Sequence, residues 1–421
     1  MDKFIIEGGA KLAGRLRICG AKNAALPIMA ASILVEGKVT LTDVPPLRDV
    51  ETMSEILTLL GMRVERTSQS VVELETADES RVEAPYDLVS TMRASICSLG
   101  PLLARRGRAR VSMPGGCVIG VRPIDLHLKG LRALGADIRV EHGFIDARAK
   151  RLKGADIYLG GPYGSSVLGT ANVMMAATLA QGRTVIENAA CEPEIQDLAH
   201  FLNRCGARIE GIGRPILVIR GVNRLHGTRH KIIPDRIEAG TYLIAGAITR
   251  SRISLTNVNP GHLAAFLDKM REAGVHFSIK TGAIEVAAPE RPGAVDLITL
   301  PYPGYPTDLQ AQIMAYLSLA RGISLVTEKI YPDRFMHVAE LCRMGADIRK
   351  EGPSAIVHGT ERLYGAPVMA SDLRASAAMV LAGLVAEGTT EVNRVYHIDR
   401  GYDRIEEKLN SLGAKIRRVS E

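Results

Sequence analysis

A glycine-rich stretch, Met113-Pro-Gly-Gly-Cys-Val-Ile-Gly-Val-Arg-Pro, places a cysteine and an arginine in one loop. Three of the six residues from 115 to 120 are glycine, a residue that packs poorly and lets a ligand approach the backbone closely. A neighbouring cation favours the thiolate form of cysteine. We therefore predict that Cys117, close to Arg122, is a reactive thiol. Pro123 is expected to begin the next helix.

A second candidate for chemistry is the acid in Pro306-Thr-Asp-Leu-Gln, which opens an apolar helix. Asp308 could be a first-turn acid of that helix or a general base towards a hydroxyl group, and the residues alone leave both readings open. No histidine spacing indicates a Cys-His hydrolase, although His127 stays open as a partner for the thiol.

Cofactor and metal signatures are weak or missing in the sequence. The glycine-rich residues 160–169 lack the Lys-Ser/Thr ending of an ATP loop and the dinucleotide pattern. No group of His, Cys, Asp or Glu has metal-ligand spacing. We expect no cofactor and no metal.

One phrase recurs six times along the chain: the end of an apolar helix, a glycine and a short strand. The glycines stand at 61, 135, 206, 274, 345 and 413, about 70 residues apart. Each is expected to end its helix in the left-handed conformation. The flanking patterns predict six βαβαββ units. Each would contain an Ala-rich helix apolar enough to be wholly buried, as at 24–34, 173–180 and 375–385.

The sixth unit stops after its Gly-Ala-Lys-Ile strand and so lacks its last strand. The N-terminal Phe4-Ile-Ile-Glu-Gly-Gly resembles that strand, and we expect residues 1–21 to complete the C-terminal half. This predicts two domains of three units each, one of residues 22–233 and one of residues 1–21 plus 234–421. The alternative is an open solenoid of six units, which we consider less favoured.

Pseudo-symmetry would bring the starts of the helices together on one face of each domain. Helix N-termini favour phosphate and carboxylate ligands. Acids at these positions, such as Asp49, Glu192 and Asp372, are each expected to be a helix cap or a surface ion pair. The cations there are predicted to form a cleft for a polyanion, and they are Lys22, Arg93, Arg122, Arg334, Arg374 and Arg400.

Composition narrows the partners. The 421 residues contain 53 Lys and Arg against 46 Asp and Glu, and they include six Phe and no Trp. Scattered charge and few aromatic platforms disfavour nucleic acid, whereas an anionic small substrate explains the basic bias. The longest apolar runs, 24–35 and 375–386, are shorter than the roughly 20 residues of a membrane span, and no secretory signal opens the chain. We expect a cytoplasmic protein with no membrane partner.

Several of these segments resemble the enolpyruvyl transferases, and together they span almost the whole chain. They are Gly20-Ala-Lys-Asn-Ala-Ala-Leu-Pro, the Pro-Gly-Gly-Cys loop with its Arg-Pro-Ile-Asp-Leu-His-Leu continuation, Asp235-Arg-Ile-Glu-Ala-Gly-Thr, Tyr305-Pro-Thr-Asp-Leu-Gln, Ser371-Asp-Leu-Arg-Ala-Ser and His397-Ile-Asp-Arg-Gly-Tyr. The resemblance implies an α/β fold of two inside-out domains, each with three pseudo-symmetric βαβαββ units.

The activity implied by the resemblance is transfer of the enolpyruvyl group of phosphoenolpyruvate to the 3′-hydroxyl of UDP-N-acetylglucosamine, with release of phosphate. This is the first committed step of peptidoglycan synthesis. The two substrates would be the small-molecule partners of the protein.

Residue roles carry over position by position. The match to Cys117 is a general acid, the match to Asp308 is a base, and the matches to Lys22, Arg122 and Arg400 hold phosphoenolpyruvate. Residues 164–170 depart from the pattern of many relatives, so we assign no diphosphate or uracil contact there. The positions that match UDP-sugar contacts are Asn23, Arg93, Arg122, Pro123, Ile124, Asp125, Leu126, Asp308 and Ile330.

Two alternatives remain on sequence grounds. A shikimate-pathway enolpyruvyl transferase would share the fold but would not be expected to have the Pro-Gly-Gly-Cys loop. A non-catalytic repeat scaffold would bind a macromolecule through its basic surface. Because position 117 is cysteine, we also expect inactivation by fosfomycin, an alkylating analogue of phosphoenolpyruvate.

Overall fold

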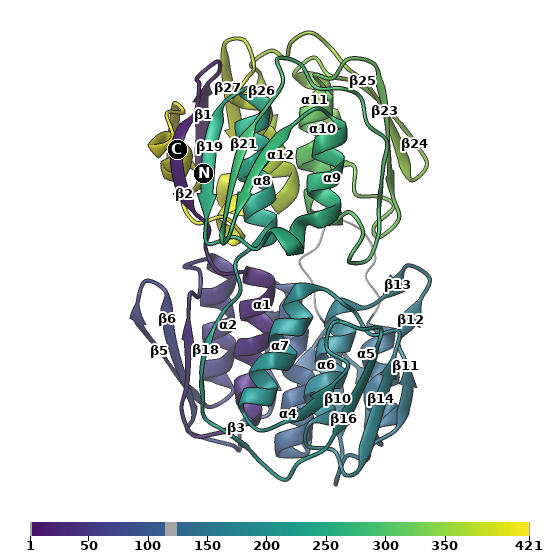
Figure 1. Ribbon diagram of the computed structural model, residues 1–421. Coiled ribbons are helices and arrows are strands. Elements are labelled where there is room, and N and C mark those ends of the chain that lie inside the picture. The colour runs from purple at the N-terminus through teal and green to yellow at the C-terminus, as the bar shows by residue number, and fades with distance from the viewer. Residues whose placement is uncertain (1, 114–123, 421) are drawn as a thin grey trace. The chain divides into compact units, whose positions relative to one another are not determined.

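The computed structural model describes residues 2–113 and 124–420 (Figure 1). Contacts divide the chain into two compact units, which change over at Cys19–Gly20 and at Ile233–Pro234. We call residues 20–233 the N-terminal unit, and residues 1–19 together with 234–421 the C-terminal unit.

Each unit contains three four-stranded sheets, as far as the described residues go, and all six sheets have one topology. The first pair of strands is parallel and the next two pairs are antiparallel. In the N-terminal unit the strand orders are β18 (Arg229–Lys231), β4 (Val39–Thr42), β6 (Val71–Thr76), β5 (Met62–Ser68); β7 (Glu83–Ala84), β8 (Arg108–Ser112), β10 (Phe144–Arg148), β9 (Asp137–Glu141); and β11 (Asp156–Tyr158), β14 (Arg183–Glu187), β16 (Ile216–Arg220), β15 (Arg208–Glu210). In the C-terminal unit they are β2 (Ala13–Arg17), β19 (Arg252–Thr256), β21 (Ala283–Ala287), β20 (His276–Lys280); β22 (Leu297–Thr299), β23 (Ile323–Glu328), β25 (Ser354–His358), β24 (Asp347–Glu351); and β26 (Pro367–Met369), β27 (Thr389–Asn393), β1 (Lys3–Glu7), β28 (Ile416–Val419).

The N-terminal strand completes the last repeat, as predicted. β1 lies between β27 and β28 and is antiparallel to both, in the place that β25 takes in the preceding sheet. Two further exchanges close the units. β2 supplies the first strand of the sheet of β19, and β18 supplies the first strand of the sheet of β4. An open solenoid would not return its ends in this way, so that alternative is wrong.

The other described elements are two short two-stranded sheets and several short helices. They are β3 (Val35–Glu36) with β17 (Leu225–His226), β12 (Gly160–Gly161) with β13 (Gly164–Ser165), α3 (Tyr86–Val89), and the 3-10 helices η1 (Ser32–Leu34), η2 (Arg93–Ser98), η3 (Pro260–Leu263), η4 (Thr307–Leu309) and η5 (Val395–Arg400).

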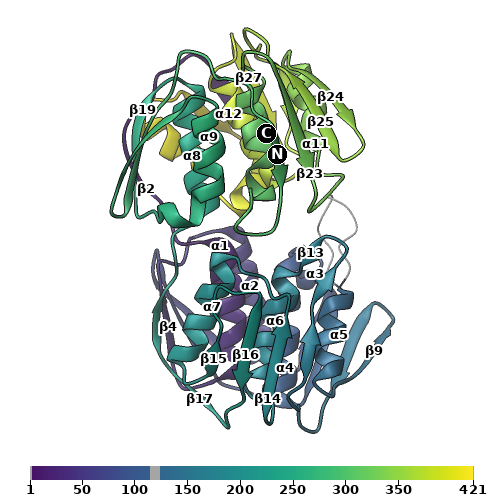
Figure 2. The same ribbon diagram turned by 45° about the vertical axis from the view of Figure 1, so that its right-hand side comes forward.

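Three helices run through the interior of each unit, with sheets and further helices around them (Figures 1 and 2). The interior helices are α1 (Lys22–Ala31), α4 (Leu99–Arg106) and α6 (Val167–Ala177), then α8 (Arg236–Ile248), α10 (Gln310–Leu317) and α12 (Leu373–Gly383). The outer helices are α2 (Arg48–Leu59), α5 (Asp125–Ala133), α7 (Pro193–Arg204), α9 (Ala264–Glu272), α11 (Met336–Arg343) and α13 (Ile405–Ser411).

Burial of the interior helices of the C-terminal unit is nearly complete. Every residue of α10 is buried, as are all but the first residue of α8 and of α12. Small side chains let these helices approach one another and the sheets closely. An added Cβ at Gly240, for example, would lie 2.5 Å from Leu309 Cδ1. Close packing of Ala, Gly and aliphatic residues therefore fills the core with few aromatic rings.

The six repeat glycines have the predicted left-handed conformation. Their φ angles range from +80° at Gly61 to +108° at Gly413. Each follows a helix and precedes a strand, so a side chain there would be strained by the backbone conformation alone.

Adjacent isoleucines in β1 test whether this strand is part of the C-terminal core. Ile6 is fully buried, whereas Ile5 is half-buried on the other face of the strand. We expect Ile6→Ala to lower the free energy of unfolding of the C-terminal unit by about 2–5 kcal/mol, because it leaves a core cavity. Ile5→Ala, the matched control, should cost clearly less. Urea unfolding of both variants would measure this, and equal costs would contradict the strand's place in the core.

Candidate functional site

The starts of the helices in the N-terminal unit carry several of the predicted residues. Lys22 is the first residue of α1, and its Nζ lies 2.8 Å from Asp49 Oδ2 in the first turn of α2. Only 11% of the Lys22 side chain and 5% of the Asp49 side chain are exposed. Asp49 is thus half of a buried ion pair, and its prediction as a cap or surface pair was wrong because the two helix starts pack together.

Other predicted residues lie beside this pair or farther along the unit. Asn23 is exposed on the first turn of α1, and Arg93 is the half-buried first residue of η2, a 3-10 helix that packs against α1. Glu192 holds the predicted N-cap position of α7, but its side chain makes no capping hydrogen bond to that helix.

Three of the predicted site residues belong to the glycine-rich loop. Cys117, Arg122 and Pro123 lie outside the described residues. The helix that follows begins at Asp125, two residues later than predicted, because Ile124 holds the N-cap position. Ile124 is buried, Asp125 is exposed and Leu126 is half-buried.

His127 is a buried neutral histidine. Its Nδ1 lies 2.8 Å from Nδ2 of Asn172, which also donates to the Ile96 carbonyl at 2.9 Å. An amide nitrogen can only donate, so His127 Nδ1 is the acceptor and its proton is on Nε2. Burial, with a smaller contribution from the charge of Arg93, lowers the pKa of His127 to about 3. The side chain thus joins α5 to α6.

In the C-terminal unit a carboxylate lies between two arginines. Arg334 Nη1 donates to Asp308 Oδ1 at 2.8 Å, and Arg374 Nη2 donates to Asp308 Oδ2 at 2.8 Å. The arginine side chains are 5% and 6% exposed, and that of Asp308 is 26% exposed. Burial opposes ionisation of Asp308, but the two guanidinium charges outweigh it and hold the pKa of Asp308 well below its usual range.

The two arginines are held from behind by different groups. Arg334 Nη1 also donates to Thr307 Oγ1 at 2.9 Å, and Arg374 Nη1 donates to the Tyr402 hydroxyl at 3.2 Å. Asp372 caps α12 by accepting from the Arg374 and Ala375 N–H groups at 2.8 and 3.1 Å, which confirms its predicted role.

Glu328 is a hub that sequence reasoning missed. Its fully buried carboxylate accepts hydrogen bonds from the hydroxyls of Thr299 and Thr307 at 2.6 and 2.8 Å. It also accepts from the backbone N–H groups of Ile330 and Tyr331 at 2.7 and 2.9 Å. These bonds fix the turn that carries half-buried Ile330 and leads to Arg334.

Arg400 ends η5 in the same unit and is half-buried. Its charge adds to burial in lowering the pKa of His397. Tyr402, two residues later, was also missed as a site residue, although it is the last residue of the matching motif His397-Ile-Asp-Arg-Gly-Tyr.

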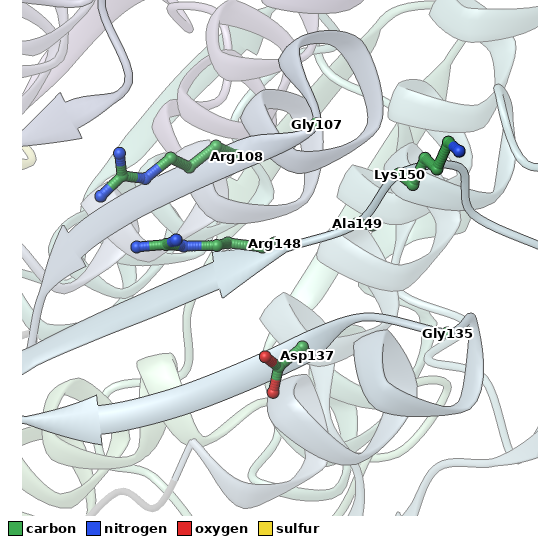
Figure 3. A pocket seen from close by; sticks show the side chains of 7 residues that line it. All are labelled: Gly107, Arg108, Gly135, Asp137, Arg148, Ala149 and Lys150. Atoms are coloured by element: carbon green, nitrogen blue, oxygen red, sulfur yellow. The ribbon is translucent and has the colours of Figure 1, made fainter.

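A surface depression of about 530 Å³ lies elsewhere in the N-terminal unit (Figure 3). It is at the start of β8 and the end of α5, whereas the predicted residues 124–126 are at the start of α5. Arg108 and Arg148 extend alongside each other there and both pair with Asp146, at 3.3 and 3.1 Å. No predicted site residue within the described ranges lines it.

Within residues 2–113 and 124–420, no three His, Cys, Asp or Glu side chains are grouped so that they could hold a metal ion. Over the same residues, none of the helices combines the length and the apolar character needed to cross a membrane.

Comparisons with known proteins agree along the whole chain. A profile of the family described as EPSP synthase (3-phosphoshikimate 1-carboxyvinyltransferase) matches residues 6–409. Proteins named UDP-N-acetylglucosamine 1-carboxyvinyltransferase from Desulfosudis oleivorans and Geobacter metallireducens are each 54% identical, over 420 and 421 residues, and the matches cover 100% of all chains.

Solved structures show the same architecture. The enolpyruvyl transferase NikO from Streptomyces tendae superposes with a TM-score of 0.90 at 25% identity, covering 99% of each chain. EPSP synthase from Acinetobacter baumannii superposes with a TM-score of 0.75 at 19% identity, covering 100% of each chain.

Two units of three βαβαββ repeats, with helices inside and sheets outside, are therefore the enolpyruvyl transferase fold, and the fold predicted from the sequence is confirmed. The chain belongs to the EPSP synthase family of enolpyruvyl transferases. The predicted transferase class is confirmed as well.

The neutral His127 gives the N-terminal unit an acid-sensitive stability. The unfolded histidine has a pKa near 6.5 and binds a proton below that pH, whereas the folded one resists protonation until about pH 3. Stability is therefore complete above pH 6.5 and falls as the pH drops towards 3. When the pH is lowered from 7 to 5, the free energy of unfolding should fall in both proteins. We expect this fall to be about 2 kcal/mol smaller in His127→Gln than in the unaltered protein, because the variant has no histidine to protonate at this position.

Urea unfolding at the two pH values measures this difference. His337 in the C-terminal unit, whose pKa burial lowers to about 4, is unchanged in both proteins and serves as the internal reference. Equal losses in the two proteins would contradict a buried neutral His127.

Proposed function

We propose that the protein transfers the enolpyruvyl group of phosphoenolpyruvate to the 3′-hydroxyl of UDP-N-acetylglucosamine and releases phosphate. The observation that carries this proposal is the 54% identity, over the full length of both chains, to relatives that bear the name of this activity. The reaction would serve the first committed step of peptidoglycan synthesis. We place the reaction in the cytoplasm.

The proposed chemistry is addition followed by elimination. Cys117 protonates the methylene carbon C3 of phosphoenolpyruvate, which leaves an oxocarbenium-like centre at C2. The 3′-hydroxyl oxygen attacks C2 while Asp308 accepts its proton. In the elimination, the Cys117 thiolate takes a proton back from C3, and phosphate leaves C2 with the proton that Asp308 had accepted, which restores the enol ether, the thiol and the carboxylate. Hydrogens and charges balance without a cofactor.

Asp308 suits the role of base in a particular way. Its two arginines keep the carboxylate ionised at neutral pH, but a low pKa also makes it a weak base. A hydroxyl that is bonding to a cationic carbon becomes strongly acidic. A weak base is therefore sufficient if proton transfer occurs late, as the C–O bond forms.

The cations would bind and stabilise negative charge. We assign phosphoenolpyruvate to Lys22, Arg122 and Arg400, because preorganised cations stabilise the charge that develops on phosphate and carboxylate during addition. Arg334 and Arg374 each pair with one oxygen of the Asp308 carboxylate and so hold the base.

We assign contacts with the UDP-sugar to positions in both units. In the N-terminal unit these are Asn23, Arg93, Arg122, Pro123, Ile124, Asp125 and Leu126. In the C-terminal unit they are Asp308 and Ile330. We further propose that residues 22–233 form the domain of the catalytic cysteine loop, and that residues 1–21 with 234–421 form the domain of the base.

Phosphate release from phosphoenolpyruvate tests the acceptor. We expect release with UDP-N-acetylglucosamine and none with shikimate 3-phosphate. Asp308→Asn should abolish turnover, because it removes the base while nearly preserving its shape. Release only with shikimate 3-phosphate would assign the protein to the other branch of the family. No release with either acceptor would favour a non-catalytic scaffold.

Fosfomycin tests the thiol. We expect one covalent adduct on Cys117, detected by intact mass and peptide mapping, together with loss of activity. Cys97 and Cys205 are buried, and burial raises the pKa of each to about 12, so they should not react. Exposed Cys342 provides the control, and Cys342→Ser should be inactivated normally. Retained activity with an unmodified Cys117 would contradict a reactive thiol.

A further inference from the structure

The hydroxyl of Tyr402 links all three interior helices of the C-terminal unit. It lies 2.8 Å from Thr241 Oγ1 on α8, 3.3 Å from Gln312 Nε2 on α10 and 3.2 Å from Arg374 Nη1 on α12. The Tyr402 side chain is 1% exposed, and the Arg374 guanidinium lies 5.6 Å from the centre of its ring.

The direction of each hydrogen bond follows from which groups have a proton to donate. Thr241 donates its hydroxyl proton to the Ile237 carbonyl at 2.9 Å, so it receives the proton of Tyr402. The Tyr402 oxygen then accepts from Arg374 and from Gln312, which can only donate through nitrogen. Burial raises the pKa of Tyr402, which keeps the hydroxyl protonated and this arrangement intact.

The same contacts decide where the Arg374 guanidinium points. Nη1 is anchored on the Tyr402 oxygen, which directs Nη2 to Asp308 Oδ2 at 2.8 Å. Gln312 Nε2 also donates to the Asp308 backbone carbonyl at 2.8 Å. The backbone of Asp308 is therefore linked to the Tyr402 hydroxyl through Gln312, and one oxygen of its carboxylate is linked to it through Arg374.

Close packing brings Tyr402 to this place. An added Cβ at the preceding residue, Gly401, would lie 2.5 Å from Leu373 Cδ2 at the start of α12. A side chain at position 401 would therefore force Leu373 to shift, so the chain that carries Arg400 lies close against the start of α12. Tyr402 consequently couples the segment of Arg400 to the ion pair of Arg374 and Asp308.

We propose that Tyr402 is a positioning residue for the base: its hydroxyl holds Arg374 so that the guanidinium orients the Asp308 carboxylate. The proposal rests on the proposed function, in which Asp308 accepts the proton of the attacking hydroxyl. Tyr402 itself touches neither substrate in this account, and its effect passes through Arg374.

Tyr402→Phe removes the hydroxyl and retains the ring. We expect kcat to fall roughly tenfold to a hundredfold, the range for losing one hydrogen bond to a charged group, with KM values near those of the unaltered protein. A less firmly held Arg374 would lower the pKa of Asp308 less. The acidic limb of the kcat/KM profile should therefore move to higher pH.

Tyr316→Phe is the matched control. Tyr316 is a buried tyrosine of α10 in the same unit, 1% exposed, and its hydroxyl has no hydrogen-bond partner among the described residues. Its removal should leave kcat and the pH profile unchanged. If Tyr402→Phe proves unstable, Thr241→Val, which removes the acceptor of the Tyr402 proton, should shift both readouts in the same direction by a smaller amount.

A double-mutant cycle with Arg374→Lys tests the route of the effect. In that background Tyr402→Phe should change kcat little further, because the guanidinium it positions is already gone. Additive losses in the cycle, or a folded Tyr402→Phe variant with normal kcat and pH profile, would overturn the proposal. Failure of the unaltered protein to release phosphate with UDP-N-acetylglucosamine would instead overturn the proposed function.

Discussion

A helix that is covered on every side can offer polar chemistry only at its ends, and this constraint governs both units. The interior helices α8, α10 and α12 are buried along almost their whole lengths. Sheets closed by exchanged strands surround them, so polar groups along their lengths, such as Thr241 and Gln312, are buried and hydrogen-bonded within the core. Chemically useful side chains are therefore confined to the helix starts, where backbone N–H groups are unpaired and favour anions.

Polar groups placed at such ends must be satisfied in surroundings that exclude much of the water. Lys22 with Asp49, and Asp308 with Arg334 and Arg374, meet this requirement by pairing charges. Removing one partner would leave a buried charge without compensation, which costs more than the pair contributes. Glu328 and Tyr402 extend the same principle, since Glu328 accepts a hydrogen bond from Thr307, which accepts one from Arg334, and the Tyr402 hydroxyl accepts one from Arg374.

The sequence allowed the fold to be predicted where the signal was local or periodic. The left-handed conformation of the six glycines was predictable because each stands between the end of a helix and the start of a strand. The N-terminal strand was recognisable because its apolar pattern matched the strand that the last repeat lacked. The capping role of Asp372 likewise followed from its place before an apolar helix.

Side-chain partners were not predictable, because they lie far apart in the sequence and follow no period. Arg334 and Arg374 are 26 and 66 residues from Asp308, and Asp49 is 27 residues from Lys22. The sequence could place each of these side chains at a helix start. It could not show which of these side chains would contact one another, and so Asp49 was predicted to be a helix cap or a surface ion pair instead of the buried partner of Lys22.

Comparison of the three interior helix starts in the C-terminal unit explains why Asp308 pairs with arginines whereas Asp235 and Asp372 cap their helices. Asp235 and Asp372 are N-cap residues. In each, one carboxylate oxygen accepts hydrogen bonds from two backbone N–H groups of its own helix. In the repeat of α10, the second of the three along the chain, Pro306 occupies the N-cap position of the 3-10 turn η4, which places Asp308 inside the first turn. Its carboxylate makes no capping bond and turns to the two arginines instead. Pseudo-symmetry thus supplies three similar helix starts, and a one-turn departure from it releases a single carboxylate for chemistry.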